Sequence, residues 1–180
     1  CSMLTSFSWG DNIGIDDLVI RNNLFYKKFT DTPFTGTISG IQNGTFRSGE
    51  RDGLWIFYYS NGQLEKKGKY KNSAKEGIWE IYWNNGRLFR KGRYKQGKKY
   101  GMWNDYHENG QLWDTGTYDS GKKVGFWEAY WMNGQIYSKG NYKDGMLNGE
   151  WLYFKIDGEL DIIFSGHYLD GVKIKDIDKT

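Results

Sequence analysis

The sequence holds few of the residues on which enzymes and metal sites most often depend. Among 180 residues there are one cysteine and two histidines, which excludes an internal disulfide and any cysteine-based zinc site. No G-x-S-x-G elbow, phosphate-binding loop or dinucleotide fingerprint occurs. We therefore expect a non-enzymatic protein with no catalytic residues, no cofactor, no metal and no small-molecule substrate.

Long apolar runs and helical patterns are also missing. No stretch of 18 apolar residues exists, so nothing in the sequence is suited to cross a membrane as a helix. One proline and 25 glycines fit a chain with many tight turns. Hydrophobic residues make up 38% of the chain and aromatic residues alone 18%. So few aliphatic side chains exclude a thick multilayer core and favour a single sheet with aromatic ladders.

The chain does contain one motif in five copies, the last of them degraded. Its G-x-W tryptophans recur every 24 residues, and so do its turn dipeptides. The tryptophans are Trp55, Trp79, Trp103, Trp127 and Trp151, and the dipeptides are Asn61-Gly62, Asn85-Gly86, Asn109-Gly110, Asn133-Gly134 and Asp157-Gly158. The final tyrosine, Tyr168, comes two residues late, so the last copy is stretched. A fixed period of this length indicates a repeat array.

Each copy is predicted to fold as one β-hairpin. Asn-Gly between two aromatic runs is a strong hairpin signal, because both central residues of a type I′ turn need a positive φ. A two-residue turn places Trp55 opposite Gly68 and Tyr59 opposite Leu64, and later copies repeat these pairs. An indole over a glycine would cover bare backbone. The predicted fold is all-β: an elongated, single-layer antiparallel rod of β-hairpins with a 24-residue period.

Alternation along the strands separates two faces of this sheet. One face carries the tryptophans with Tyr59, Leu64 and Tyr70 and their repeats, and we expect it to form the core. The other carries Tyr58 and its repeats beside Phe89, Trp113 and Tyr137, and we expect it to form the surface. That second face also holds a set of cations: Lys67, Lys69, Lys91, Arg93 and Lys139.

Charge is unevenly spread although the net charge is only +3. Residues 61–100 hold twelve Lys/Arg and three Asp/Glu, a net of +9, whereas residues 144–180 have a net of −4. This asymmetry indicates a contact surface for an acidic protein partner. The predicted anchors are Tyr58, Tyr82 and Phe89, with Arg87, Lys91, Arg93 and Lys95 as the surrounding cations. The alternative is a solvated face whose charges prevent edge-to-edge aggregation. Nucleic-acid binding is disfavoured, because the aromatics recur in every copy and the cations do not.

One copy has two like charges paired across its predicted hairpin, which is unfavourable. The predicted register places Asp105 directly opposite Asp114, where other copies have no like-charged pair, and His107 projects to the same side. A protonated His107 could offset the two carboxylates. A basic group from a partner, or from the tail around Lys173 and Lys175, could dock there instead. A metal, or two aspartates splaying into water, are the remaining alternatives.

The chain divides into four predicted parts. Residues 1–16 are an N-terminal tether, and residues 17–43 form an opening hairpin, with its turn at Asn22-Asn23, and a lead-in. Residues 44–170 are the hairpin repeats, and residues 171–180 are a charged tail with room for one short capping strand. At ~4.8 Å per strand, five two-strand repeats give a rod of roughly 50 Å before the ends are added.

The repeat motif G-x-W-x-x-Y-x-x-N-G-x-L-x-x-x-G-x-Y-x-x-G resembles the variant MORN repeat of bacteria. The lead-in at residues 17–37, with its Asp31-Thr32-Pro33-Phe34, is similar to the usual opening of that family. The resemblance covers roughly residues 17–170 and implies a β-hairpin rod. Many relatives carry an "antitoxin" label, and eukaryotic MORN proteins are associated with membrane-proximal scaffolding and protein contacts. Fold alone does not determine function.

The identity of residue 1 bears on where in the cell the protein is located. Cys1 is the only cysteine, and small, polar Ser2 follows it, as at the start of a mature bacterial lipoprotein after its signal peptide is removed. The expectation is a scaffold held at the outer membrane of a bacterial cell envelope through an acylated Cys1, as a subunit of a larger membrane-associated complex. The alternatives are a chain that merely begins at this residue, and a cytoplasmic, antitoxin-like binder that sequesters a partner protein.

Overall fold

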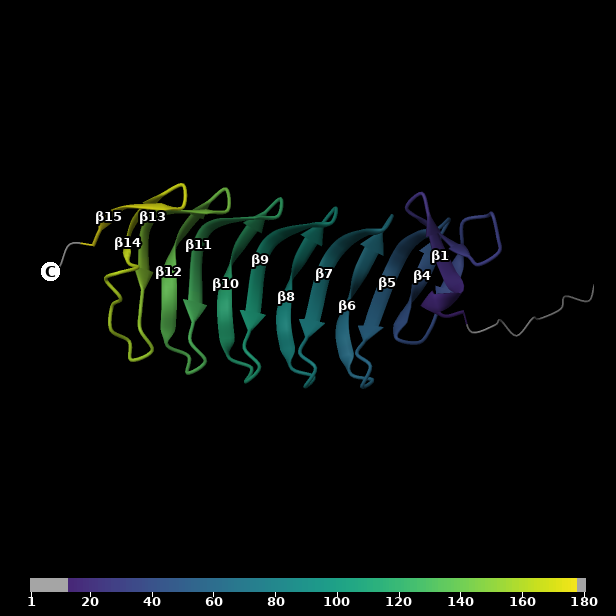
Figure 1. The fold of residues 1–180 in the computed structure, drawn as a ribbon, viewed down its shortest axis with the longest axis horizontal. Helices are drawn as coiled ribbons and strands as arrows, with labels where there is room; N and C mark the ends of the chain where they lie inside the picture. Colours follow the sequence, from purple (N-terminus) through teal and green to yellow (C-terminus); the bar gives the residue numbers. More distant parts are fainter. Residues whose placement is uncertain (1–12, 178–180) are drawn as a thin grey trace, which may run out of the picture.

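The computed structural model describes residues 13–177, and these form an elongated all-β array (Figure 1). Thirteen antiparallel strands, β3 to β15, follow one another in chain order in a single sheet, while β1 and β2 form a separate two-stranded sheet. The predicted all-β rod of hairpins is confirmed. The strands are β1 (Leu18–Arg21), β2 (Leu24–Lys27), β3 (Gly36–Ile38), β4 (Gln42–Arg47), β5 (Glu50–Tyr58), β6 (Leu64–Lys71), β7 (Ala74–Tyr82), β8 (Leu88–Lys95), β9 (Lys98–Tyr106), β10 (Leu112–Asp119), β11 (Lys122–Tyr130), β12 (Ile136–Lys143), β13 (Met146–Tyr153), β14 (Gly166–Leu169) and β15 (Val172–Asp176).

Two kinds of connection alternate along the sheet. Tight two-residue turns with positive φ at both positions join one repeat to the next, as at Asn72-Ser73 (50° and 60°) and Gln96-Gly97 (51° and 78°). Both residues of a type I′ turn have positive φ, so these connections are of that type. The turn of the β1–β2 hairpin at Asn22-Asn23 has the same form. Tight turns therefore lie on one long edge of the sheet, and the Asn-Gly loops lie on the other (Figure 1).

The Asn-Gly loops differ from the predicted type I′ turns. Gly62 has a φ of 83°, but Asn61 does not have a positive φ. The Asn61 side chain instead accepts a hydrogen bond from the Gln63 amide (3.0 Å), and the Tyr59 amide donates to the Gln63 carbonyl (2.8 Å). An asparagine that satisfies the amide two residues onward favours this local turn. The loop is wider than predicted, and a bulge follows it.

This bulge changes part of the predicted register. Trp55 pairs with Gly68, Trp79 with Gly92 and Trp103 with Gly116, as predicted. The predicted pairing of Tyr59 with Leu64 is wrong, because Leu64 pairs with Tyr58. The register shift leaves one residue of the second strand unpaired between the leucine pair and the next pair of each hairpin. The side chain of this bulged residue points to the same face of the sheet as that of its neighbour.

Each repeat tryptophan packs against the preceding repeat and donates a hydrogen bond to it. Trp103 is almost fully buried, its indole lies against Gly92, and its Nε1–H donates to the Arg93 carbonyl (3.1 Å). The equivalent indoles make the same bond, to carbonyls ten residues upstream: Trp55 to Thr45, Trp79 to Lys69, Trp127 to Thr117 and Trp151 to Asn141. Tyrosines such as Tyr94 fill the spaces between successive indoles with edge-on contacts, 5.1 Å between ring centroids for Tyr94 and Trp103. The tryptophan face therefore forms the core, as predicted.

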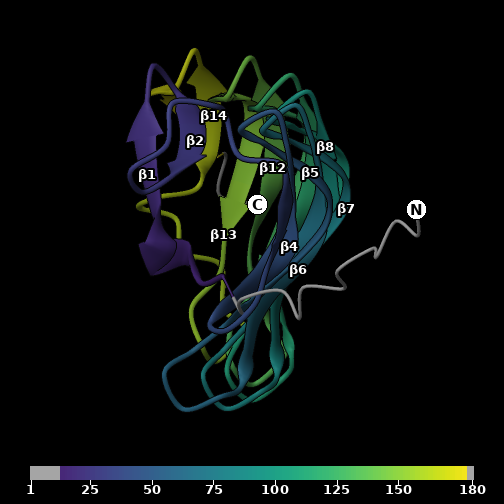
Figure 2. The same cartoon turned by 90° about the vertical axis from the view of Figure 1, so that its right-hand side faces the viewer.

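The β1–β2 hairpin covers the N-terminal end of the tryptophan face. Phe25 of β2 lies 4.6 Å from Phe46 between ring centroids, and Leu18 of β1 is buried in the core cluster with Trp55. Figure 2 shows the hairpin on the inner side of the curved sheet, and Figure 1 places it at the N-terminal end of the array, beside β4 and β5. Residues 13–16, within the predicted tether, also contact the fold, since Ile13 and Ile15 pack against this cluster.

The C-terminal end closes with a distorted copy. After β13 the chain makes a long excursion over residues 154–165 before β14 and β15 complete the sheet. Buried Ser165 accepts a hydrogen bond from the Tyr153 amide (2.8 Å). The stretched last copy therefore still joins the sheet, and β15 is a short capping strand within the predicted tail.

Candidate interaction surfaces of the repeat sheet

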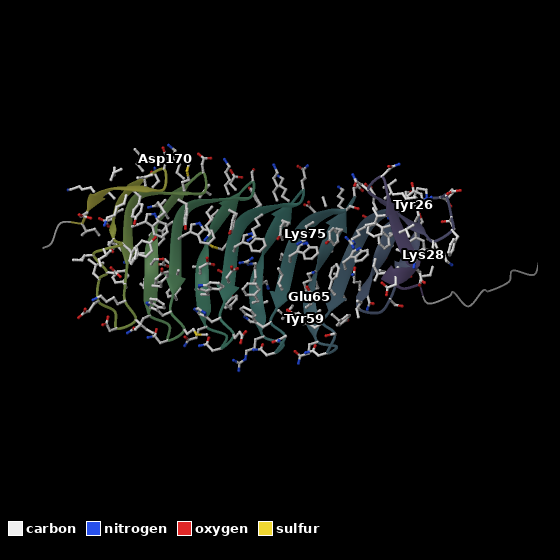
Figure 3. All side chains as sticks on the ribbon, viewed as in Figure 1. Tyr26, Lys28, Tyr59, Glu65, Lys75 and Asp170 are labelled. Atoms are coloured by element: carbon white, nitrogen blue, oxygen red, sulfur yellow. The ribbon has the colours of Figure 1, made fainter. Side chains whose placement is uncertain are left out.

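A ladder of cations lies on the tryptophan face. Lys75, Lys99 and Lys123 each place their ammonium group over a tryptophan and a tyrosine ring; for Lys99 the distances are 4.4 Å to the Trp103 centroid and 4.5 Å to the Tyr118 centroid. Figure 3 shows Lys75 in the middle of the strands. Burial lowers the pKa of Lys99 to about 8, because removal from water disfavours the charged amine. This ladder repeats with the motif and serves the packing of the sheet.

A second row crosses the tryptophan face and does not repeat. Between the constant tryptophan and leucine rows, neighbouring strands from β5 to β13 contribute residues that pair directly, one after another. We call this the variable row: Phe57, Lys66, Ile81, Arg90, Asp105, Asp114, Ala129, Ser138 and Tyr153. Because the surrounding framework is constant, this row gives each repeat a different local surface.

The predicted pairing of Asp105 with Asp114 is confirmed, and both lie in the variable row. Each aspartate, however, has a cation on its other side: Arg90 pairs with buried Asp105, and the Lys123 ammonium lies 3.2 Å from an Asp114 carboxylate oxygen. Burial raises the pKa of Asp114; Lys123 opposes this rise and Asp105 adds to it. The two carboxylates are therefore part of a four-residue charge network within the sheet.

His107 does not join that network. Its Nε2 lies 2.8 Å from the Tyr130 carbonyl oxygen, and its ring stacks on Trp113 at 5.6 Å. The residues at the same position in other copies make the equivalent bond to the next repeat: Tyr59, Trp83 and Trp131 donate to the carbonyls of Tyr82, Tyr106 and Phe154. His107 is therefore a substitute donor in a constant structural contact. Lys173 of the tail does not dock on the aspartates either, since it binds Asp176 and the Ile163 carbonyl.

Two kinds of site are absent from residues 13–177. No group of three or more His, Cys, Asp or Glu side chains is arranged to hold a metal ion. No helix in that range has the length and apolar character needed to cross a bilayer. Cys1 lies outside the described residues, and its acylation stays a prediction.

The face opposite the tryptophans, here called the outer face, has its own charge network. Glu80 binds both Lys67 and Lys91, each at 2.9 Å, and the Tyr82 hydroxyl donates to it at 2.9 Å. Hydrogen bonds from Lys91 and Lys67 lower the pKa of Glu80 to about 2. Arg93 and Lys69, on the same face, make no ion pair within the described part of the chain. The basic surface of these repeats is therefore partly neutralised and partly free.

The predicted contact residues are spread over several surfaces. Tyr82, Lys91 and Arg93 share the outer face with Tyr58, whereas Arg87 and Lys95 lie towards the two long edges. Phe89 was predicted on the outer face, and this is wrong. It is the bulged residue between Leu88 and Arg90, and its ring contacts Trp83 (4.3 Å between centroids) and Trp113 (6.4 Å). Trp113 and Tyr137 turn to the tryptophan face for the same reason.

Sequence reasoning missed an exposed apolar row on the outer face. Its members recur every 24 residues and are 53–61% exposed: Leu54, Ile78, Met102 and Phe126. Two troughs lie between the first three, with volumes of about 400 and 410 Å³. Lys69 pairs across the sheet with Leu54, and Arg93 with Ile78. The available signal was an apolar residue directly before each of the first four repeat tryptophans, with a period of 24 residues.

Family comparison agrees with this architecture. The profile of the family described as MORN repeat variant matches residues 51–72, 75–96, 99–120 and 123–144 in four consecutive copies. The chain belongs to this family. MORN repeats are non-catalytic modules of protein interaction or membrane binding, and the motif copies each correspond to one hairpin, from β5–β6 to β11–β12.

Other comparisons add little to the MORN assignment. No curated protein is significantly similar in sequence. Among solved structures, the chain is similar to part of one described as the GtfA/B complex bound to UDP and GlcNAc, at 16% identity and a TM-score of 0.20. The match covers 87% of this chain and 28% of that one. A likeness at this level supports no argument about function.

Proposed function

We propose that this MORN-repeat protein is a non-enzymatic scaffold that binds a partner protein through the outer face of β5 to β9. The observation that carries the proposal is the exposed apolar row, of which Leu54, Ile78 and Met102 border the two troughs. A row of exposed apolar side chains with polar residues beside it is typical of a surface that another protein covers.

The charges around the troughs indicate the chemistry of that partner. Arg93 lines both troughs, and Lys69 lines the first. Neither has an ion-pair partner among residues 13–177, whereas Lys67 and Lys91 are held by Glu80. The proposed partner therefore presents apolar side chains to the troughs and carboxylates to Lys69 and Arg93. Complementary charge of this kind raises the rate of association more than the final affinity.

Charge reversal tests the electrostatic part of the proposal. The partner is first captured by a photo-crosslinking residue placed at position 54, then purified, and its association rate is measured at two salt concentrations. The double variant Lys69→Glu, Arg93→Glu is expected to associate more slowly than wild type at low salt, and the difference should shrink at high salt. Lys98→Glu with Lys143→Glu, at the tight-turn edge, is the matched control.

Two results would count against this proposal. Equal association rates for both double variants would place the contact elsewhere. Binding of the wild type to anionic lipid vesicles, with no protein crosslinked at position 54, would favour the membrane-binding behaviour of MORN repeats instead.

The envelope location proposed for this scaffold rests on a lipid at Cys1. Intact-mass measurement of the protein purified from its native source in mild detergent tests it. An acylated species is expected; a bare 21.1 kDa chain that stays soluble without detergent would contradict it.

A further inference from the structure

The variable row contains one gap. At seven of its nine positions the side chain is larger than that of serine, whereas the paired residues Ala129 and Ser138 are both small. A cavity of about 250 Å³ lies over this pair, on the tryptophan face. Ligand pockets for drug-sized molecules run from roughly 300 to 1,000 Å³. This cavity is therefore of a size for one ring or one side chain.

Aromatic rings form the walls of the cavity. Tyr153 pairs with Ser138 on one side, and Trp113 lies on the other, beside Asp114. Trp113 is 42% exposed and Tyr137 is 38% exposed, so both reach the mouth of the cavity. The rings of Tyr137 and Tyr153 meet edge to face with centroids 5.8 Å apart. Such walls favour a flat, apolar body, which gains both area burial and ring contacts.

Of the three charged residues that line the cavity, Asp114 and Lys123 pair with each other, and the Glu128 carboxylate accepts a hydrogen bond from the Tyr130 hydroxyl (3.0 Å). The Asp114 carboxylate and the Lys123 ammonium are 3.2 Å apart, and Lys123 also lies 3.8 Å from the Trp127 ring centroid. A cationic guest would meet Lys123, and an anionic guest would meet Asp114 together with nearby Asp105. An uncharged guest avoids both repulsions and the cost of burying a new charge.

Ser138 supplies the polar end of the cavity. Ser138 lines the cavity, and the residue as a whole is 6% exposed. Within residues 13–177 its hydroxyl makes no hydrogen bond to another residue. Its oxygen is not among the fully buried side-chain atoms that lack a partner, so it faces the open space of the cavity and is available to a guest. A guest that brings its own hydroxyl group to this point would satisfy it.

We infer that the cavity over Ala129 and Ser138 receives one tyrosine side chain of a partner protein. The phenol ring lies between Trp113 and Tyr153, and the phenol hydroxyl bonds to the Ser138 hydroxyl. Tyrosine is a frequent anchor in protein interfaces, since it buries a rigid apolar ring and retains one polar atom. The site is on the opposite face from the troughs beside Ile78 and does not depend on them.

Small neutral probes test the site in the full 180-residue chain. N-acetyl-tyrosinamide, N-acetyl-phenylalaninamide and methyl β-glucoside are titrated separately, and the indole N–H resonances of Trp113 and Trp127 are followed by NMR. Ala129→Leu fills the cavity, and Ser138→Ala removes the hydroxyl. Ala74→Leu, the same substitution at the start of β7, is the matched control, and the spectrum of each variant reports its fold.

The expected result is saturable binding of the tyrosine amide with a Kd on the order of 1 mM. The phenylalanine amide should bind about fivefold more weakly, as for the loss of one hydrogen bond. Ser138→Ala should abolish that fivefold difference, and Ala129→Leu should abolish saturation by both amides while Ala74→Leu leaves it unchanged.

Several results would overturn the inference. These are no saturable shift of either indole, undiminished binding by a folded Ala129→Leu variant, or equal binding of the two amides. Binding of the glucoside alone would assign the cavity to a saccharide. None of these results bears on the outer face, so the two proposals fail separately.

Discussion

The indole of Trp103 lies on Gly92 of the preceding repeat, so close that a β-carbon at Gly92 would overlap the ring. Four other tryptophans have the same relationship to a glycine of the strand before them. The tryptophan is therefore a contact between repeats, and its place opposite a second glycine in its own hairpin is a consequence of the strand alternation.

Gly92→Ala should destabilise the protein by about 2–3 kcal/mol, because the added methyl group displaces a fully packed ring. Gly101→Ala is the control: its β-carbon would meet nothing within 4 Å, although its φ is 69°, and the strained backbone alone should cost about 1 kcal/mol. Urea unfolding measures both changes. Equal losses would show that the indole does not limit the space at Gly92.

His107 should be replaceable by tyrosine but not by phenylalanine. Tyr59 occupies the same position two copies upstream, and its hydroxyl donates to the Tyr82 carbonyl at 2.7 Å. We expect His107→Phe to lose about 1 kcal/mol relative to His107→Tyr, since the Tyr130 carbonyl is left without its partner. Thermal or urea unfolding of the two variants decides this. Identical stability would mean that the bond contributes nothing.

Asp114→Asn should change how stability depends on pH. Burial raises the pKa of Asp114 in the folded state above its usual value of about 3.9. The folded state then holds the proton more tightly than the unfolded state. As the pH rises from the unfolded-state pKa of Asp114 to its folded-state pKa, this group therefore lowers the stability of the protein. Wild type should therefore lose free energy of unfolding relative to Asp114→Asn above pH ~4. A difference that does not vary with pH would show that Asp114 titrates alike in both states.

Lys99→Met should stabilise the sheet, and the effect should fade in alkali. The pKa of Lys99 is lowered to about 8 by burial, so folding favours its neutral form and wild-type stability rises relative to the variant between pH ~8 and ~10.4. Methionine keeps the contact with Trp103 without a buried charge. Unfolding at pH 7 and at pH 10 gives the comparison. The same difference in free energy of unfolding between wild type and Lys99→Met at both pH values would contradict the lowered pKa.

The repeat period, the hairpins and the Trp55–Gly68 register could all be predicted, because each depends on residues within one copy. The loop at Asn61-Gly62 could not, since the Asn61 side chain competes for the Gln63 amide and widens the turn. The wider loop leaves one bulged residue in each hairpin, and its side chain points to the other face of the sheet. Phe89 is such a residue, which is why it was expected on the wrong face.

The variable row shows a second limit. The sequence identified Asp105 and Asp114 as a pair, because one hairpin contains both. Arg90 and Lys123 come from the neighbouring hairpins, and their approach depends on the register between repeats. The exposed row at Leu54 and Ile78 was missed although its period is visible in the sequence, because the pattern alone does not show how far each side chain is exposed.

The affinity of the purified partner for Ile78→Asp tests the central proposal most directly. Ile78 borders both outer-face troughs and is 53% exposed, and Ile20 on β1 is a matched control at 63% exposure. Burying an isoleucine side chain is worth about 1.5–3 kcal/mol. We expect at least a tenfold loss of affinity for Ile78→Asp and none for Ile20→Asp. Unchanged affinity of a folded Ile78→Asp variant would contradict it.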